Sequence, residues 1–150
     1  MKKIKLTLGK FTLVDDEDFD RLNKIKWSLN SKHDGYARSA KYGMMSRYIM
    51  DTPKNKQCDH MNHNVLDNRK ENLRNCTPSH NHYNTKKSII NKSGYKGVSR
   101  HKMSGKWEAR IRVMKIKKHI GLFMNKIEAA RAYDNYAIRY HKKFAKLNFV

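Results

Sequence analysis

The feature that most constrains this chain is the charge of its last 66 residues. They carry eighteen Lys and Arg against three Asp and Glu, in a chain of 150 residues with a formal net charge of +21. The rest of the chain is less basic, with +5 over residues 1–54 and +1 over residues 55–84. So many like charges repel one another unless a polyanion offsets them. Nucleic acid is the obvious polyanion.

The same segment has the pattern of a small antiparallel sheet. Polar and apolar residues alternate in three short runs, with turns expected at Gly105 and near Lys115. In the middle run, Arg110 and Arg112 fall on the face of Glu108, and the residues between them fall on the other face. The strands are expected over residues 95–101, 106–114 and 117–123.

A helix is expected after these strands, over residues 126–142. Asn125 and Glu128 have the spacing of a capping box. An apolar side of this helix can cover one face of the sheet, which leaves the arginines on the other. The side is formed by Ala129, Tyr133, Tyr136 and Tyr140, with Ala130 and Ala137 allowing close approach.

The first half of the chain reads as short strands and helices. Strands are expected over residues 2–7 and 10–14 around a turn at Gly9, followed by a helix that Asp15 caps. The acidic run after Asp15 is interpreted as the first turn of this helix rather than a metal site. A strand near residues 36–39 and a helix ending before Pro53 complete this part.

Several protein classes are disfavoured by composition. The chain has no apolar run of membrane-spanning length and no signal-peptide pattern, and its basic tail is not an amphipathic surface helix. The prediction is therefore an intracellular, cytoplasmic protein without a membrane partner. Cys58 and Cys76 lack the spacing of a zinc module and are interpreted as small core residues.

Residues 58–84, CDHMNHNVLDNRKENLRNCTPSHNHYN, are rich in side chains suited to chemistry. Asp59 and Asn81 offer oxygen ligands for one hard divalent cation. His60 lies next to Asp59, where a histidine could act as the general base that deprotonates a water molecule. One metal ion and one base can together cleave a phosphodiester.

Here the motifs DHMNHN, LDNRKENLR and CTPSHNHYN resemble the HNH homing endonucleases of phages and mobile introns, a ββα-metal fold. The resemblance implies Asp59 and Asn81 as metal ligands and His60 as general base. It assigns the bracing asparagine, which orients the histidine, to Asn72, with Asn68 as the competitor. The chain departs from the family at Ser46, where a histidine is usual, and at His63, where a glycine is usual.

Each of these residues also has a structural interpretation. His60 could be a hydrogen-bonded structural histidine, and Asn81 could be a turn or helix cap. His80 and His82 could be a third ligand or a phosphate contact, although a solvated position is the simpler interpretation. Trp107 could stack on a base, but a position at the edge of the core is favoured.

The tail, residues 94–149, resembles the Apetala-two (ethylene-response-factor) DNA-binding domain, through GYKGVSRH, GKWEARIRV, HIGLF, EAARAYDNYAIRYH and LNF. In that family the sheet lies in the major groove and the helix packs behind it. Ser99 and His119 stand where plant members typically have Arg and Trp, so a target sequence is not carried over. The positions expected to bind DNA are Lys96, Ser99, Arg100, His101, Arg110, Arg112, Lys117 and His119.

The sequence thus predicts an α+β chain with four regions. Small N-terminal strands occupy residues 1–54, a ββα-metal HNH core residues 55–84, a linker residues 85–93, and a three-stranded antiparallel sheet packed on one helix residues 94–150. The first hypothesis for function is a monomeric HNH-type endonuclease, a phosphodiester hydrolase that nicks or cleaves double-stranded DNA with a divalent ion, Mg²⁺ or alternatively Mn²⁺. The alternative is a DNA-binding transcriptional regulator with a degenerate nuclease core. An RNA-binding protein is disfavoured because exposed aromatic pairs for stacking bases are lacking.

Overall fold

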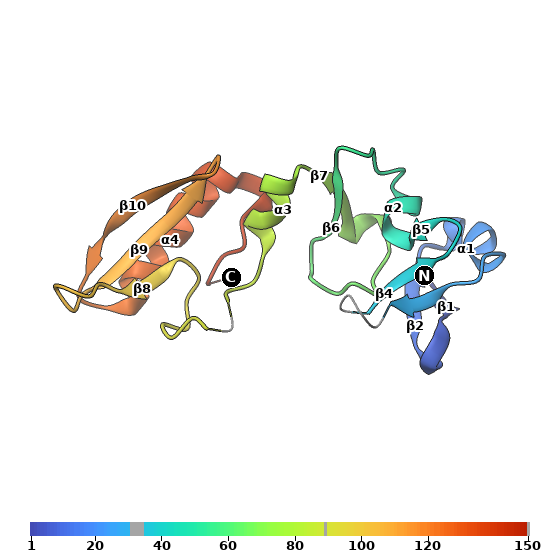
Figure 1. The fold of residues 1–150 in the computed structure, drawn as a ribbon, viewed down its shortest axis with the longest axis horizontal. Coiled ribbons are helices and arrows are strands. Elements are labelled where there is room, and N and C mark those ends of the chain that lie inside the picture. Colours follow the sequence, from blue (N-terminus) through green and yellow to red (C-terminus); the bar gives the residue numbers. More distant parts are fainter. Residues whose placement is uncertain (31–34, 89, 150) are drawn as a thin grey trace. The chain divides into compact units, whose positions relative to one another are not determined.

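The computed structural model describes residues 1–30, 35–88 and 90–149, and the chain divides into two compact units (Figure 1). Unit 1 is Met1–Pro78 and unit 2 is Ser79–Val150. Both units combine antiparallel strands with helices, so the expected α+β class is confirmed. The structure does not show the HNH core that was expected over residues 55–84.

Unit 1 consists of three small sheets and short helices. β1 pairs with β2, β4 pairs with β3 on one side and β5 on the other, and β6 pairs with β7, all antiparallel. Its strands are β1 (Lys2–Lys5), β2 (Phe11–Val14), β3 (Ser28–Asn30), β4 (Tyr36–Ser39), β5 (Gly43–Met44), β6 (Gln57–His60) and β7 (Leu73–Cys76), and its helices are η1 (Thr7–Gly9), α1 (Asp16–Asn23), α2 (Met45–Ile49) and η2 (Lys70–Asn72).

An apolar cluster holds unit 1 together. Val14, Leu22 and Met45 are fully buried in it, and they come from β2, α1 and α2. The Trp27 indole packs in the same cluster and donates to the Leu22 carbonyl at 2.9 Å. Large side chains from separate elements therefore join the three sheets into one small core.

The first expected strand is shorter than predicted, because the chain turns at Thr7. The η1 turn contains Leu8 at φ 58° and Gly9 at φ 65°, which confirms the turn expected at Gly9. Helix α1 begins after Asp15, as expected, but the Asp15 carboxylate does not cap it. It accepts from the Lys70 backbone N–H at 2.7 Å instead, and so ties the helix to η2.

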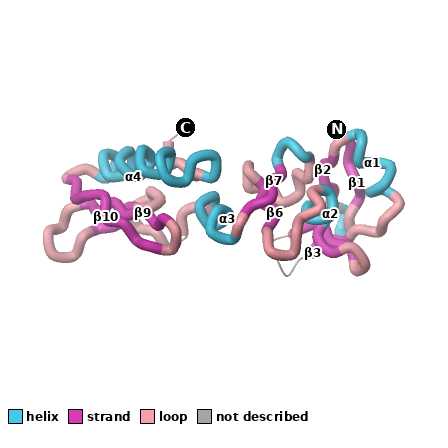
Figure 2. Tube along the Cα trace, turned by 90° about the horizontal axis from the view of Figure 1, so that it is seen from above, coloured by secondary structure: helices cyan, strands magenta, loops and turns pink. Residues whose placement is uncertain are grey.

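Unit 2 is a three-stranded antiparallel sheet with one long helix, which confirms the predicted architecture. The strand order is β10-β9-β8, and α4 lies along one face of the sheet (Figure 2). Within the described residues no helix lies along the other face. The elements are α3 (Pro78–Asn84), β8 (Val98–Arg100), β9 (Trp107–Val113), β10 (Ile116–Phe123), α4 (Lys126–His141) and η3 (Lys142–Phe144).

Strand β8 begins three residues later than predicted. Gly97 adopts φ 76°, and a Cβ at this position would lie 2.0 Å from the Tyr133 ring. Only glycine allows this approach of the backbone to α4. The preceding residues instead form a turn in which the Ser93 hydroxyl donates to the Tyr95 carbonyl at 3.0 Å.

Asn125 caps α4 as predicted, since its side chain accepts from the Ile127 N–H at 2.8 Å, whereas the part of Glu128 in a capping box stays a prediction. Ala129 and Tyr133 are buried, but Tyr136 is 37% exposed, so its predicted place in the apolar side was wrong. Ala130 and Ala137 are buried as well, and their small side chains let the helix approach Ala109 and Ile111 of β9 closely, as predicted. The full buried set of the helix is Ala129, Ala130, Tyr133, Asp134, Ala137 and His141.

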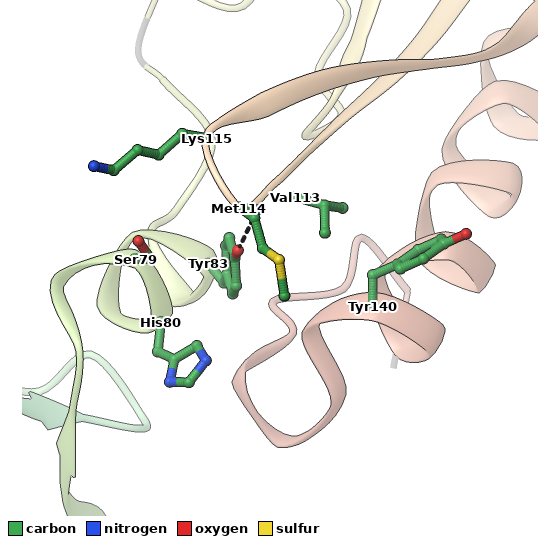
Figure 3. Close-up of a pocket in the computed structure, with 7 residues that line it drawn as sticks. All are labelled: Ser79, His80, Tyr83, Val113, Met114, Lys115 and Tyr140. Carbon is green, nitrogen blue, oxygen red and sulfur yellow. Dashed lines mark hydrogen bonds between the residues drawn. The ribbon is translucent and has the colours of Figure 1, made fainter.

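The division between the units precedes the linker expected at residues 85–93, because α3 packs within unit 2. The Tyr83 ring stacks on His141 with centroids 3.7 Å apart, and its hydroxyl accepts from the Met114 N–H at 3.0 Å (Figure 3). His80 stacks on Phe144 at 4.3 Å. Residue 89 of the expected linker lies outside the described residues.

The hairpin turn that Tyr83 contacts consists of Met114 and Lys115. Both have positive φ, 48° and 69°, as a two-residue turn that follows the sheet twist requires. These residues and α3 border a cavity of about 260 Å³, which Tyr140 also lines (Figure 3). Tyr83 therefore supports a turn whose residue types do not favour its backbone conformation.

None of the described helices is long and apolar enough to cross a membrane. Cys58 is half-buried and Cys76 is buried, as the core interpretation predicted. Burial raises the pKa of the Cys58 thiol, which donates to the Ser46 carbonyl at 3.5 Å.

Candidate nucleic-acid interface

The face of the unit 2 sheet opposite α4 brings together five of the eight residues expected to bind DNA. In the β9-β10 register Arg110 opposes His119 and Arg112 opposes Lys117, and in the β8-β9 register Ser99 opposes Glu108. Opposed residues of antiparallel strands point to the same face. We call this set the basic face: Ser99, Glu108, Arg110, Arg112, Lys117 and His119.

The alternation expected in β9 is confirmed. Ala109 and Ile111 are buried against α4 at 0% and 2% exposure, and Arg110 and Arg112 are exposed. Burial of the small and branched residues on one side therefore fixes the arginines on the other.

Glu108 is the exception on the basic face, because its side chain is buried. Its Oε1 accepts from Arg110 Nε at 2.7 Å and from His119 Nδ1 at 2.9 Å. Burial alone would raise the pKa of Glu108, but the bonds from Arg110 and His119 outweigh it and the pKa is lowered. The sequence placed Glu108 on this face but assigned it no role.

Arg112 and Lys117 form the other row of the basic face. Both side chains are exposed, and within the described part of the chain neither is in an ion pair. Two neighbouring cations without a carboxylate favour the approach of an anion such as a phosphate.

The other three expected residues lie elsewhere. Lys96 is half-buried, and its ammonium donates to the Tyr83 and Thr85 carbonyls at 2.6 and 2.7 Å. Burial lowers its pKa to about 8. Arg100 lies over the Trp107 ring at 4.8 Å, and His101 Nδ1 is bonded to Ser104 Oγ at 2.9 Å in the β8–β9 turn. Lys96 thus ties α3 to the sheet. Binding of DNA by Lys96, Arg100 and His101 stays a prediction.

Trp107 occupies the edge of the core, as favoured from the sequence. It is half-buried and packs beside Val98 and Ala109. Its ring faces the Arg100 guanidinium rather than the basic face.

Hydrogen bonds that hold Asn148 and Phe149 were not predicted from the sequence. The buried Asp134 carboxylate accepts from the Asn148 and Phe149 N–H groups at 2.9 Å each. The Asn148 side chain in turn bonds both backbone groups of Lys96, at 2.6 and 3.1 Å. Spacing gives no signal for this contact, which links α4, the chain end and the residues before β8.

The residues expected to form a nuclease centre are Asp59, His60, Asn72 and Asn81. Three of them and Asn68 lie together in unit 1, and we call Asp59, His60, Asn68 and Asn72 the central cluster. Each is at most 6% exposed. Asn81 lies on α3, within unit 2.

The two roles expected of Asn72 are divided between two asparagines. Asn72 braces the loop, since it accepts from the Asn62 N–H at 2.9 Å and donates to the Asp67 carbonyl at 2.8 Å. Asn68 Oδ1 holds His60 Nε2 at 3.0 Å, and Asn68 Nδ2 donates to Thr12 Oγ1 at 2.8 Å. The competitor, Asn68, therefore orients the histidine. Burial lowers the pKa of His60.

The Asp59 carboxylate is held by Arg74 across the β6-β7 pair. Its Oδ2 accepts from Arg74 Nε at 2.9 Å and from Nη2 at 2.7 Å. This is a buried ion pair, in which these two bonds from Arg74 go to the same carboxylate oxygen. Among the described residues there is no group of three His, Cys, Asp or Glu placed to hold a metal ion.

Comparison with known proteins gives relatives for part of the chain. Over 59 residues it is 49% identical to APETALA2-like protein 2 of Oryza sativa subsp. indica and to the protein of that name of subsp. japonica. It is 48% identical over 59 residues to the ethylene-responsive transcription factor WRI1 of Arabidopsis thaliana. The match covers 38% of this chain and 13–14% of each relative. No family model and no solved structure matches.

These relatives contradict the prediction of an enzyme. One is named as a transcription factor, and none of the three is named as a nuclease. The expected hydrolase is thus corrected on the evidence of these relatives. They do not test the metal-ligand roles expected of Asp59 and Asn81 or the general-base role expected of His60. The comparisons support an Apetala-two DNA-binding domain, and they favour the DNA-binding regulator over the nuclease.

Proposed function

We propose that this chain is a DNA-binding transcriptional regulator whose basic face contacts double-stranded DNA. The observation that carries the proposal is the sidedness of the unit 2 sheet. Its apolar side chains pack on α4, and its cations lie exposed on the other face. A regulator acts in the compartment that contains the DNA, so in a nucleated cell the expected location is nuclear rather than cytoplasmic.

Two further observations support the proposal. One of the relatives, WRI1, is named as a transcription factor. Unit 2 also carries eighteen Lys and Arg against three Asp and Glu, which gives a charge that a polyanion would offset.

Under this proposal the central cluster has a structural role in unit 1, and a monomer remains the expected state.

The test is the salt dependence of binding to a labelled duplex. Affinity should fall as salt rises from about 50 to 200 mM, because each phosphate contact releases condensed counterions. Arg112→Ala and Lys117→Ala should each reduce the slope of log affinity against log salt by about one. Arg139→Ala removes the same charge from exposed α4, on the other side of the sheet, and should leave the slope close to that of the wild type.

Equal slopes for Arg112→Ala, Lys117→Ala and Arg139→Ala would place the DNA elsewhere and contradict the proposal. Thermal unfolding of each variant shows whether a change in slope arises with unit 2 intact.

A further inference from the structure

The basic face contains one carboxylate, and it lies where a carboxylate opposes DNA binding. Glu108 is 5% exposed and sits in the central strand of the sheet. Its negative charge repels phosphate and reduces the attraction of a polyanion. If this buried carboxylate contributes to DNA binding, it does so through something other than the overall affinity for DNA.

Glu108 holds two side chains that are neighbours on adjacent strands. Arg110 and His119 oppose each other in the β9-β10 register, and both bond the same oxygen, Oε1. Their side chains are still 54% and 53% exposed. Glu108 thus anchors one end of each side chain and leaves the other accessible.

The anchoring decides which hydrogen-bonding groups are presented. A carboxylate only accepts, so Nδ1 of His119 carries a proton, and when Nε2 carries none it is an acceptor. Arg110 uses Nε on Glu108, which leaves its two terminal nitrogens as paired donors. The neighbouring pair therefore presents two donors beside one acceptor.

This arrangement complements one kind of base pair in the major groove. Guanine presents two acceptors, N7 and O6, and its partner cytosine presents the N4 amino donor. Adenine presents one acceptor and one donor, so it cannot take two hydrogen bonds from an arginine. We propose that Glu108 is a positioning residue that sets Arg110 and His119 to read a G·C base pair. This inference rests on the proposed DNA binding and adds its specificity.

The row of Arg112 and Lys117 provides the contrast within the same face. These two cations have no carboxylate partner among the described residues, and exposed cations can contact phosphates of any sequence. We therefore expect Arg110 and His119, which Glu108 holds, to discriminate between base pairs. We expect Arg112 and Lys117 to supply non-specific affinity.

The experiment selects preferred duplexes from a randomised pool with the full chain, and then measures affinity after replacing each G·C pair by A·T. For the wild type, one replacement should weaken binding about tenfold or more. Glu108→Ala should lose most of that difference, whereas its affinity for a duplex of unrelated sequence should stay equal or rise, because a negative charge has been removed. A merely structural role of Glu108 would weaken binding to both duplexes.

Two further variants and a matched control keep the result decisive. Glu108→Gln preserves the size of the side chain and one acceptor, so it should fold and show a reduced preference for G·C. Arg110→Lys keeps the cation but lacks the planar fork, and it should reproduce the loss of preference. Glu128→Gln, on the exposed first turn of α4, removes the same charge and should keep the full preference.

The outcomes separate this inference from the proposed function. If the folded wild type binds no duplex, DNA binding itself fails. If it binds with a preference for G·C that Glu108→Gln and Arg110→Lys leave unchanged, or if the Glu108 variants weaken binding to every duplex equally, the role of Glu108 is overturned.

Discussion

The central cluster of unit 1 and the basic face of unit 2 are both rich in polar side chains, but they differ in burial and in partners. Each residue of the central cluster is at most 6% exposed. Asp59 is bonded to Arg74, and His60 to Asn68. On the basic face, Arg112 and Lys117 are exposed, and within the described residues neither is in an ion pair. Polar groups that satisfy one another inside a domain specify its fold, and exposed ones remain available to a partner.

Breaking the ion pair of the central cluster should have the largest effect. Arg74→Ala leaves the Asp59 carboxylate buried without its cation, which should cost about 3–5 kcal/mol of the free energy of unfolding of unit 1. Urea denaturation followed by the fluorescence of Trp27, with Trp107→Phe in the background, reports on unit 1 alone, since each unit has one tryptophan.

Glu17→Ala is the control for this prediction, because it breaks an exposed ion pair with Lys70 and should change little. DNA affinity should be unchanged in Arg74→Ala as long as unit 2 stays folded. A variant as stable as the control would show that the buried pair is not part of what holds unit 1 together.

Removing the asparagine that orients His60 should have a smaller effect. Asn68→Ala leaves His60 Nε2 and Thr12 Oγ1 without this partner, which should cost about 1–3 kcal/mol. The same substitution at Asn135, on the exposed side of α4, should have little effect on stability. The idea that the cluster is structural is refuted if Asn68→Ala is as stable as Asn135→Ala.

Unit 2 could be predicted from the sequence largely because its signals are local. Alternation in β9 determines which side chains face α4, and Asn125 marks the start of the helix within two residues of its hydrogen-bond partner. The basic face follows from the same period of two. The position of Tyr136 was missed because the smaller Ala130 and Ala137 define the buried side.

The contacts of Asp59 could not be predicted in the same way, because they depend on register. Asp59 opposes Arg74 only because β6 and β7 pair with this offset, and residue types do not reveal an offset between strands. Lys96 is a second case. Its engagement with the Tyr83 and Thr85 carbonyls depends on α3 packing within unit 2, whereas the composition of residues 85–93 indicated a linker.

Lowering the pH should have the smallest of these effects on stability, and it tests a buried polar group of unit 2. His141 is buried behind the basic face, where its Nε2 donates to the Arg112 carbonyl at 2.8 Å and its Nδ1 has no hydrogen-bond partner among the described residues. Burial lowers its pKa below the ordinary 6.5, and the charges of Lys96, His80 and His82 act in the same direction. Because the folded pKa lies below the unfolded one, His141 contributes its full stability above about pH 6.5 and loses it as the pH falls through the folded pKa.

The Tm of unit 2, followed by Trp107 fluorescence with Trp27→Phe in the background, should therefore fall between pH 7.5 and pH 5, conditions that bracket the ordinary His pKa of about 6.5. His141→Gln keeps a donor for the Arg112 carbonyl but cannot take up a proton, so its Tm should fall less over the same interval. An identical fall in both proteins would mean that protonation of His141 does not limit the stability of unit 2. A smaller fall in the variant would show that protonation of the buried His141 limits the stability of unit 2. A buried polar group behind the basic face would then serve the fold, as we propose for the central cluster in unit 1.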